Sequence, residues 1–258
     1  MTTVPKGRAS ERLDSWGVGT RLGIIIPAED VGQESELQFL ATPEVRIHTA
    51  RVQTPERTAS QRPGDIARAF VTPPRLDDAV ASLAQASVDA IACAFTSSAY
   101  VLRAEGEDAV LDRVSPRTAG IPLVTSSVAV RLALEELGVQ RVSILHPPWF
   151  DVTLDELGAA YFDAAGFEVA SHGRFTGAPE PRRIDASDLI DYVEGVVSAH
   201  SPDAVVLAGN EFAVTRLIPA LQQMLGVHVV TSNQALYQWL MQAAAGNPPP
   251  SVTTAPQK

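Results

Sequence analysis

The turn Thr96-Ser97-Ser98 is the first place where this sequence offers residues suited to chemistry. It follows the apolar run DAIACAF at 89–95, so it is expected at the carboxyl end of a buried strand. Hydroxyls and free backbone N–H groups at the start of a helix suit a carboxylate ligand. The plain alternative is a turn whose hydroxyls are solvated or cap the next helix. From the turn alone both interpretations stay open.

Cys93, the only cysteine of the chain, lies inside that apolar run. No His, Lys or Arg stands near it in the sequence, whereas a reactive thiolate needs electropositive, partly exposed surroundings. A free cysteine otherwise behaves as a small buried hydrophobe. We therefore expect Cys93 to be buried and unreactive. A single cysteine also excludes an intramolecular disulfide and zinc-type cysteine spacing.

A second polar turn, Gly209-Asn210-Glu211, follows the apolar run DAVVLAG at 203–209. The amide of Asn210 can donate to a carboxylate, and Glu211 can act as a general base where a closed site raises its pKa. The alternative is a solvated loop. We take Asn210 and Glu211 as catalytic candidates and Gly209 as a substrate-binding one.

A third polar turn, Thr125-Ser126-Ser127, stands before the helical pattern VAVRLALEELG. Capping of that helix and contact with a substrate are both open here.

His146 directly follows another apolar run and precedes two prolines. Histidine is the usual proton shuttle near neutral pH, so His146 is a catalytic candidate, although a lone histidine is often structural. Trp149 would line an apolar wall of the site. The sequence has no GxGxxG, GxxxxGK[ST], HExxH or GxSxG motif, so nucleotide, zinc-protease and serine-hydrolase sites have no local support and no metal site is predicted.

The elements that would position these residues alternate between strands and helices. Several of the expected strands are short, unalternated and β-branched, which is typical of strands buried on both faces of a parallel sheet. Helical patterns lie between them, at 73–87, 126–138, 151–166, 185–200 and 212–226, and three of them end at a glycine: Gly138, Gly166 and Gly226. This alternation predicts an α/β fold. The expected strands are 21–27, 45–52, 89–95, 121–126, 140–146, 167–175, 203–209 and 227–232.

A faint internal repeat relates the two polar turns. DAIACAFTSSAYV followed by IPLVTSSVAVRLAL resembles DAVVLAGNEFAV followed by VHVVTSNQALYQWL. In open α/β sheets, ligands bind outside the carboxyl ends of the strands. If the two halves face each other, the turns 96–98 and 209–211 face each other across a cleft.

The stretches LGIIIP, ACAFTSSAYV, GIPLVTSSVAVRLALEELGVQRVSIL and DAVVLAGNEFAVTRLIPALQQMLGVHVVTSNQALYQWL, in this order, resemble the aspartate/glutamate racemase superfamily. The similarity is to its branch of maleate cis–trans isomerase and arylmalonate decarboxylase, and it runs from about Leu22 to Gly246. It implies two pseudo-symmetric, Rossmann-like (flavodoxin-like) α/β domains with parallel sheets and a cofactor-free active site in the interdomain cleft. It also implies that the C-terminal helix packs back on the first domain.

The resemblance implies one catalytic cysteine after each of the two repeated strands. The matching positions hold Thr96, and Gly209 or Asn210, and Cys93 lies three residues too early. A Thr-Pro-Tyr-like element of the family reads His146-Pro147-Pro148-Trp149 here. Isomerisation through a covalent cysteine adduct should therefore be impossible.

The repeat and the resemblance together favour a ligand site at the turn 96–98, with Thr96 as a catalytic candidate and Ser97 and Ser98 as substrate-binding ones. Glu29, a further substrate-binding candidate, ends the first expected strand, where the family usually has a small or amide residue that touches the substrate. An acid at this position would repel a dicarboxylate, which argues against maleate as the substrate or for a turn that points away.

The net charge and the lengths of the apolar runs exclude some classes of binding partner. A formal net charge of −10 argues against a nucleic-acid binder, and no apolar run approaches the length of a membrane span. We expect a cytoplasmic protein with a small carboxylate ligand, no cofactor and a homo-oligomeric state left open. The expected domains are 21–127 plus 232–246 and 128–231, with flexible tails at 1–20 and 247–258.

Two functions remain open from the sequence. The first is a cofactor-independent lyase or isomerase of a small carboxylate, working by non-cysteine chemistry. The second is a catalytically degenerate carboxylate-binding or accessory protein that keeps the cleft.

Overall fold

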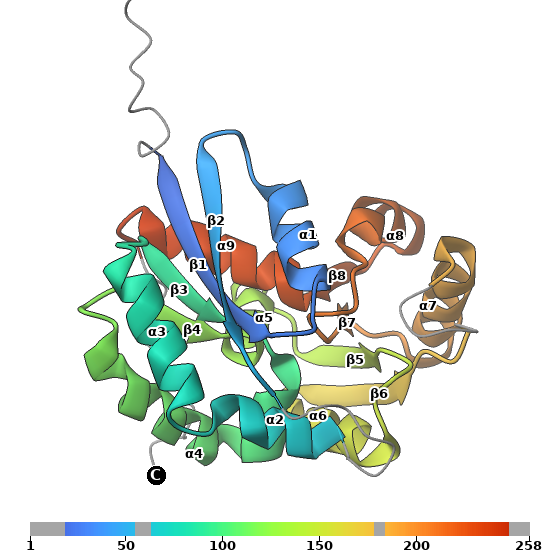
Figure 1. The fold of residues 1–258 in the computed structure, drawn as a ribbon. Helices are drawn as coiled ribbons and strands as arrows, with labels where there is room; N and C mark the ends of the chain where they lie inside the picture. The colour runs from blue at the N-terminus through green and yellow to red at the C-terminus, as the bar shows by residue number, and fades with distance from the viewer. Residues whose placement is uncertain (1–18, 55–62, 178–183, 248–258) are drawn as a thin grey trace, which may run out of the picture.

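The computed structural model describes residues 19–54, 63–177 and 184–247, and the strands of this part form two parallel sheets (Figure 1). The strand order is β2-β1-β3-β4 in the first sheet and β6-β5-β7-β8 in the second, so the two sheets share one topology. This confirms the predicted α/β class with two similar parallel sheets. The strands are β1 (Thr20–Pro27), β2 (Val45–Val52), β3 (Ala90–Cys93), β4 (Leu123–Thr125), β5 (Arg141–His146), β6 (Glu168–Arg174), β7 (Ala204–Leu207) and β8 (His228–Thr231).

Helices connect successive strands. Those the sequence pattern predicted are α3 (Arg75–Gln85), α5 (Ser126–Glu136), α6 (Val152–Ala164), α7 (Ala186–His200) and α8 (Ile218–Leu225). The helix expected after the turn 96–98 is α4 (Thr96–Val114), and the C-terminal helix that the resemblance implied is α9 (Ser232–Ala244). The structure adds α1 (Gly32–Leu40) and α2 (Pro63–Val71), and short 3-10 turns at Ser115–Arg117 and Thr215–Leu217. The predicted glycine stops are confirmed, because Gly138, Gly166 and Gly226 all have positive φ after a helix.

The internal repeat of the sequence corresponds to β3 and β7, which occupy equivalent central places in the two sheets. Their sequences, AIAC and AVVL, are buried at every position, as expected for strands covered on both faces. Each follows an aspartate that closes the start of the sheet: Asp89 accepts a hydrogen bond from the backbone of Arg21 at 2.7 Å, and Asp203 accepts one from the backbone of Arg141 at 2.8 Å.

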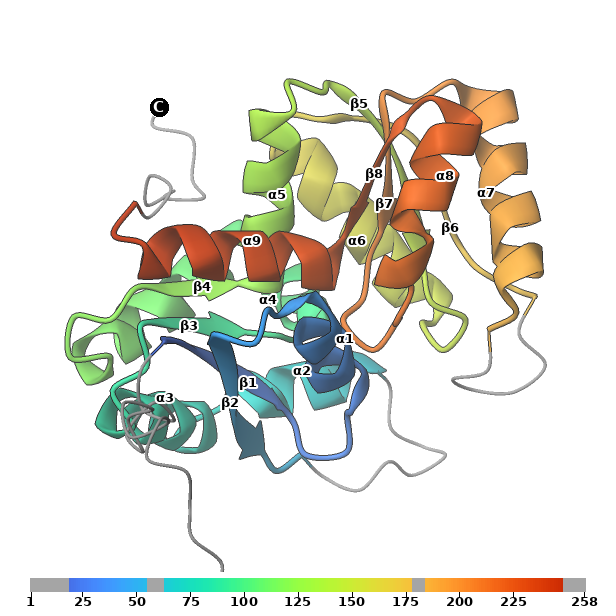
Figure 2. The ribbon, with the colours of Figure 1, turned by 90° about the horizontal axis from the view of Figure 1, so that it is seen from above.

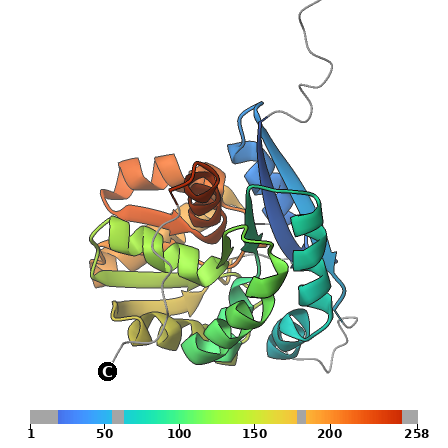
Figure 3. The ribbon, with the colours of Figure 1, turned by 90° about the vertical axis from the view of Figure 1, so that its left-hand side faces the viewer.

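One apolar core joins the two sheets. It contains the inward faces of β1, β3, β5 and β7 together with α5, α6 and α9. The outer face of the first sheet packs against α2, α3 and α4, and the outer face of the second against α7 and α8. Figure 3 shows the two sheets side by side with α9 between them.

The helix α9 begins at the end of β8 in the second sheet and crosses to the first (Figure 2). It contacts α1, α5, β1 and β3, so the C-terminal helix packs back on the first sheet as the resemblance implied. The predicted domain boundaries stay a prediction. The predicted tails lie outside the described residues apart from Gly19, Thr20 and Asn247.

Candidate active site

A buried polar cluster lies where the carboxyl ends of the central strands meet. Thr96 begins α4 after β3, Ser126 begins α5 after β4, Asn210 lies in the turn after β7, and Ser232 begins α9 after β8. All four are at most 3% exposed. The structure therefore brings together three predicted site residues and adds Ser232.

Three hydrogen-bond donors converge on one oxygen of this cluster, the amide Oδ1 of Asn210. The backbone N–H of Thr96 donates to it at 2.8 Å, the Thr96 hydroxyl at 2.6 Å and the Ser126 hydroxyl at 2.8 Å. An amide oxygen with three donors has the surroundings of a carboxylate oxygen or an enediolate. The three donors around the Asn210 oxygen are thus of the kind that could also hold a negatively charged oxygen.

The rest of the Asn210 side chain is also held. Its Nδ2 donates to Oδ1 of Asn233 at 2.8 Å, and Nδ2 of Asn233 donates to the Asn210 carbonyl and to Glu36, both at 2.7 Å. The Ser232 hydroxyl accepts from the backbone N–H of Gly209 at 3.0 Å. Burial raises the pKa of Glu36, although hydrogen bonds from Asn233 and Thr215 oppose the shift.

Ser232 and Asn233 were not among the predicted site residues, yet the sequence contained their signal. They follow β8 in the motif Val-Thr-Ser-Asn, as Ser126 and Ser127 follow β4 in Val-Thr-Ser-Ser. The threonine of each motif caps the next helix: Thr125 accepts from the N–H of Val128, and Thr231 from that of Gln234.

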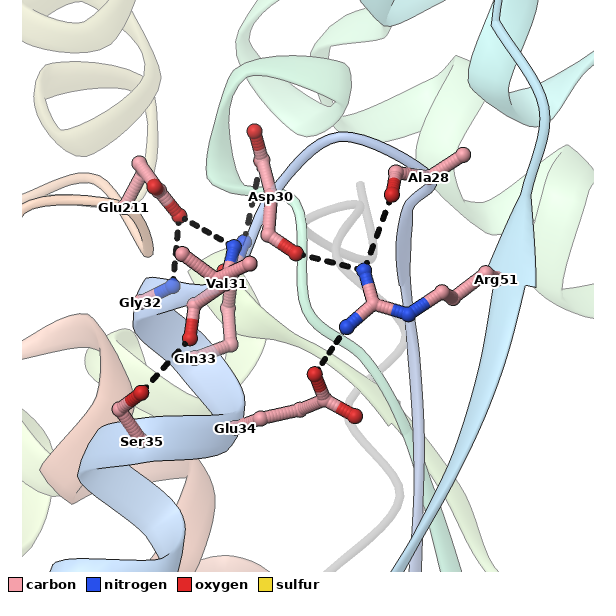
Figure 4. A network of polar contacts seen from close by, with 9 residues as sticks. All are labelled: Ala28, Asp30, Val31, Gly32, Gln33, Glu34, Ser35, Arg51 and Glu211. Atoms are coloured by element: carbon pink, nitrogen blue, oxygen red, sulfur yellow. Dashed lines mark hydrogen bonds and ion pairs between the residues drawn. The ribbon is translucent and has the colours of Figure 1, made fainter.

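Glu211 directly follows Asn210 in the chain, and its side chain is hydrogen-bonded to the start of α1 (Figure 4). Its Oε2 accepts hydrogen bonds from the backbone N–H groups of Val31 at 3.1 Å and Gly32 at 2.8 Å, at the start of α1. A helix N-terminus favours a carboxylate, so this contact fastens the turn after β7 to the first sheet. Arg51 supports the same loop, since its Nη1 donates to the carbonyl of Asp30 at 2.7 Å.

His146 belongs to a separate buried group. Its Nδ1 lies 2.6 Å from Asp155 Oδ1, and Nδ1 of His172 lies 2.7 Å from Asp155 Oδ2. Burial lowers the pKa of His146. Burial alone would raise the pKa of Asp155, but hydrogen bonds and charges of the two histidines bring it below its usual range. Asp155 is therefore ionised, and a neutral His146 donates through Nδ1.

The second ring nitrogen of His146 has no hydrogen-bond partner among the described residues. It lies under α6, where a Cβ added at Gly158 would come within 2.5 Å of it. The ring stacks on Phe150 and meets the edge of Tyr100, with centroids 5.2 and 5.5 Å away. His146 has no hydrogen bond to Thr96 or Asn210 in this part of the chain.

Other predicted residues have local partners. The Ser98 hydroxyl donates to the Phe95 carbonyl at 2.8 Å, and the Ser127 hydroxyl to the Thr96 carbonyl at 3.4 Å. Thr125 donates to the buried carboxyl of Glu107, which also accepts from Tyr161 at 2.7 Å. Burial raises the pKa of Glu107 to about 7, against the effect of these two hydrogen bonds.

Three predicted residues show no hydrogen bond to the cluster in the described structure. Ser97 is buried, with no side-chain hydrogen bond found among the described residues. Trp149 packs edge-on against Phe212, with ring centroids 6.3 Å apart. Glu29 accepts from the Thr54 hydroxyl at 3.1 Å.

Cys93 is buried in the core between the first sheet and its outer helices, as expected. Burial raises the pKa of its thiol to about 12, so the thiolate is absent near neutral pH. Among residues 19–54, 63–177 and 184–247, no group of three His, Cys, Asp or Glu side chains is arranged to hold a metal ion. No helix of the same ranges is long and apolar enough to cross a membrane.

Comparison with known proteins agrees with this architecture. The profile of a family described as arylmalonate decarboxylase matches residues 72–255. An arylmalonate decarboxylase of Bordetella bronchiseptica is 29% identical over 129 residues, which are 49% of this chain and 53% of the relative. The chain thus matches about half the length of that relative.

Two solved structures with similar folds are maleate isomerases. One, from Nocardia farcinica, is a cysteine-to-serine mutant with a covalently bound succinylcysteine intermediate; its TM-score is 0.71 at 18% identity, over 88% of this chain and 93% of the other. The other, from Pseudomonas putida S16, contains maleate; its TM-score is 0.72 at 20% identity, over 88% of this chain and 92% of the other.

Proposed function

This chain belongs to the arylmalonate decarboxylase family, and we propose that it acts on a small carboxylate as a cofactor-independent lyase or isomerase without cysteine chemistry. The observation that carries the proposal is the convergence of the Thr96 N–H, the Thr96 hydroxyl and the Ser126 hydroxyl on one oxygen. In this proposal a substrate carboxylate replaces the amide oxygen of Asn210 there.

The chemical task of these donors is to stabilise a carbanion next to a carboxylate. When a malonate loses one carboxylate as CO2, the electrons of the broken C–C bond pass to the carboxylate that remains and form an enediolate. Donors fixed at 2.6–2.8 Å from the position of that oxygen stabilise the new charge without reorganising. The enediolate then takes up a proton at carbon, either from water or from a cluster hydroxyl.

Cysteine cannot supply that proton. Cys93 is the only thiol of the chain, and its side chain packs in the core between the first sheet and its outer helices, with none of the cluster residues in that core. The two titratable candidates from the sequence, His146 and Glu211, are held by Asp155 and by the start of α1. The proposed enzyme therefore differs from the maleate isomerase whose intermediate is bound to cysteine.

Substrate entry requires movement of the turn that carries Asn210. Gly209 precedes it with a φ of +116°, and Glu211 follows it and holds it to α1. Because Gly209 tolerates such angles, it can serve as the hinge. We propose that the turn swings outward when the contact between Glu211 and the α1 N-terminus opens.

A binding protein without chemistry is the second candidate, and one observation favours it. In the described part of the chain, the groups that contact the central oxygen are hydroxyls and a backbone N–H, none of which titrates near neutral pH. Such a protein would bind a carboxylate in the same place and release it unchanged. Location in the cytoplasm and a homo-oligomeric state stay predictions from the sequence.

The deciding experiment follows phenylmalonate, maleate and a hydantoin by NMR in D2O with purified protein. An enzyme forms product, and a decarboxylated product carries deuterium next to the carboxylate. Ser126→Ala should remove the activity, whereas Cys93→Ala, outside the cluster, should retain it. If the protein binds these acids but forms no product, the enzyme proposal is wrong and the binding protein is the function that remains.

A further inference from the structure

A cavity of about 380 Å³ lies between α4, α5 and α6, away from the strand-end cluster. It is bordered by Tyr100 and Arg103 of α4, Arg131 of α5, and Leu157 and Tyr161 of α6. None of the residues that bond to Asn210 lines it. Its volume is in the range of small-molecule sites in proteins.

Buried donors without acceptors border this cavity. Arg131 has a side chain only 9% exposed, and its Nη1 pairs with Glu135 at 3.1 Å. Its Nε and Nη2 are buried and find no acceptor among the described residues, and neither does the hydroxyl of the fully buried Tyr100. Buried polar groups are nearly always hydrogen-bonded, so these donors lack an oxygen that an occupant could supply.

The backbone of Arg103 provides a second, independent observation. It has φ +60° and ψ 178° in the interior of α4, a combination that glycine alone adopts readily. Its exposed guanidinium has no hydrogen bond or ion pair within the described ranges. Strain of this kind concentrates at ligand sites, because it aims a side chain that an unstrained backbone would direct elsewhere.

The other residues that line the cavity indicate the chemical class of ligand that it would bind. Leu157 and the rings of Tyr100 and Tyr161 give an apolar surface, together with alanines of α4 and α6. Glu105 also borders the cavity, and Glu135 already pairs with Arg131, so a second negative charge on the ligand would be repelled. Arginine binds a planar carboxylate through paired N–H groups.

We propose that this cavity is a second ligand site, which binds a monocarboxylate with an apolar, phenyl-sized body through Arg131, Arg103 and Tyr100. The carboxylate oxygens accept from the guanidinium groups and the phenol, and the body lies against Leu157 and Tyr161. The proposal does not rest on the proposed function, because it uses no residue of the strand-end cluster.

The test is calorimetric titration with phenylacetate and its neutral isostere phenylacetamide. Arg131→Met, which keeps an unbranched apolar stem but removes the guanidinium, should weaken phenylacetate at this site by about tenfold or more. Ala160→Leu, an exposed position at the cavity, should weaken both compounds by narrowing it. Ser126→Ala separates this site from the cluster, since it should leave this binding unchanged.

Arg103→Gly gives a readout that a structural role would not produce. The glycine relieves the backbone strain, so it should raise the melting temperature while it weakens phenylacetate. A crystal soaked with 4-bromophenylacetate should show the anomalous bromine signal between α4 and α6. Equal binding of acid and amide, or full binding by Arg131→Met, would overturn the proposal, and so would binding that Ser126→Ala alone removes.

Discussion

Replacement of Asn210 by alanine tests whether the strand-end cluster is built around an anionic oxygen. The truncation removes the acceptor of three hydrogen bonds and the donor of one. Two of the groups that lose a partner have another nearby: the Thr96 hydroxyl lies 3.2 Å from Ser232, and the Ser126 hydroxyl 3.3 Å from the Cys93 carbonyl. The Thr96 N–H and Oδ1 of Asn233 have no such substitute.

Two buried groups left unsatisfied cost roughly 2–6 kcal/mol, at about 1–3 kcal/mol each. For a chain of this length we expect the melting temperature to fall by roughly 4–24 °C. The free energy of unfolding should be measured by urea denaturation for the wild type and for Asn210→Ala. Ser97→Ala is the matched control, because it removes a buried hydroxyl one residue from Thr96 for which no hydrogen bond is found.

Formate should rescue the variant. It is small enough for the space of the lost amide and offers an oxygen to the same donors. At a concentration one hundred times its Kd it should restore about 2.7 kcal/mol. The wild type should bind formate more weakly, since its own amide must first leave. A loss within about 0.5 kcal/mol of the control, or equal stabilisation of both proteins by formate, would refute the reasoning.

Three further predictions concern buried groups. The pKa of Glu107 is about 7 in the folded protein against an ordinary value of 4.5. The folded state therefore binds a proton that the unfolded state has lost, and stability should fall as pH rises from about 4.5 to 7. Glu107→Gln should flatten that decrease of roughly 3 kcal/mol in unfolding titrations; an unchanged slope would exclude Glu107 as its source. The Cys93 thiol should not react with a disulfide reagent at pH 7.5 and should give one equivalent after denaturation, whereas fast reaction of the native protein would contradict its burial. Gly158→Ala brings a Cβ within 2.5 Å of His146 and should destabilise the fold by about 1–3 kcal/mol or more in urea. The control Gly195→Ala, in open space on α7, should stabilise it by up to about 1 kcal/mol, and equal effects of the two would disprove the close packing.

The strands and the repeat were predictable because their signals are local. The runs around β3 and β7 are apolar and end at polar turns, and the structure places both at the centre of equivalent sheets. The resemblance to the maleate isomerase and arylmalonate decarboxylase branch is confirmed in the same way, by a family match over residues 72–255. α1 and α2 were not predicted, because each spans only 9 residues and so gives a short helical pattern.

The hydrogen bonds between the polar residues of the site were predictable only in part. The repeat pointed to Thr96 and Asn210 as neighbours, and they are hydrogen-bonded. It did not indicate that Glu211 turns to the start of α1, because that contact joins residues 179 positions apart and depends on how one sheet is set against the other. Glu36 was missed for the same reason: it lies within a helix, and its partners Thr215 and Asn233 belong to the second half of the chain.

The path of α9 has a consequence for synthesis on the ribosome. The first sheet is complete once β4 ends at Thr125, but one of the helices that covers it begins only at Ser232. More than a hundred residues must be translated in between, which takes roughly 5–20 s at bacterial and eukaryotic elongation rates. During that interval the nascent chain exposes the apolar face of β1 and β3, to which a chaperone that acts on nascent chains could bind. The N-terminal half can therefore complete its native packing only after α9 has left the ribosome. A chain that ends before Ser232 should aggregate rather than yield a folded fragment.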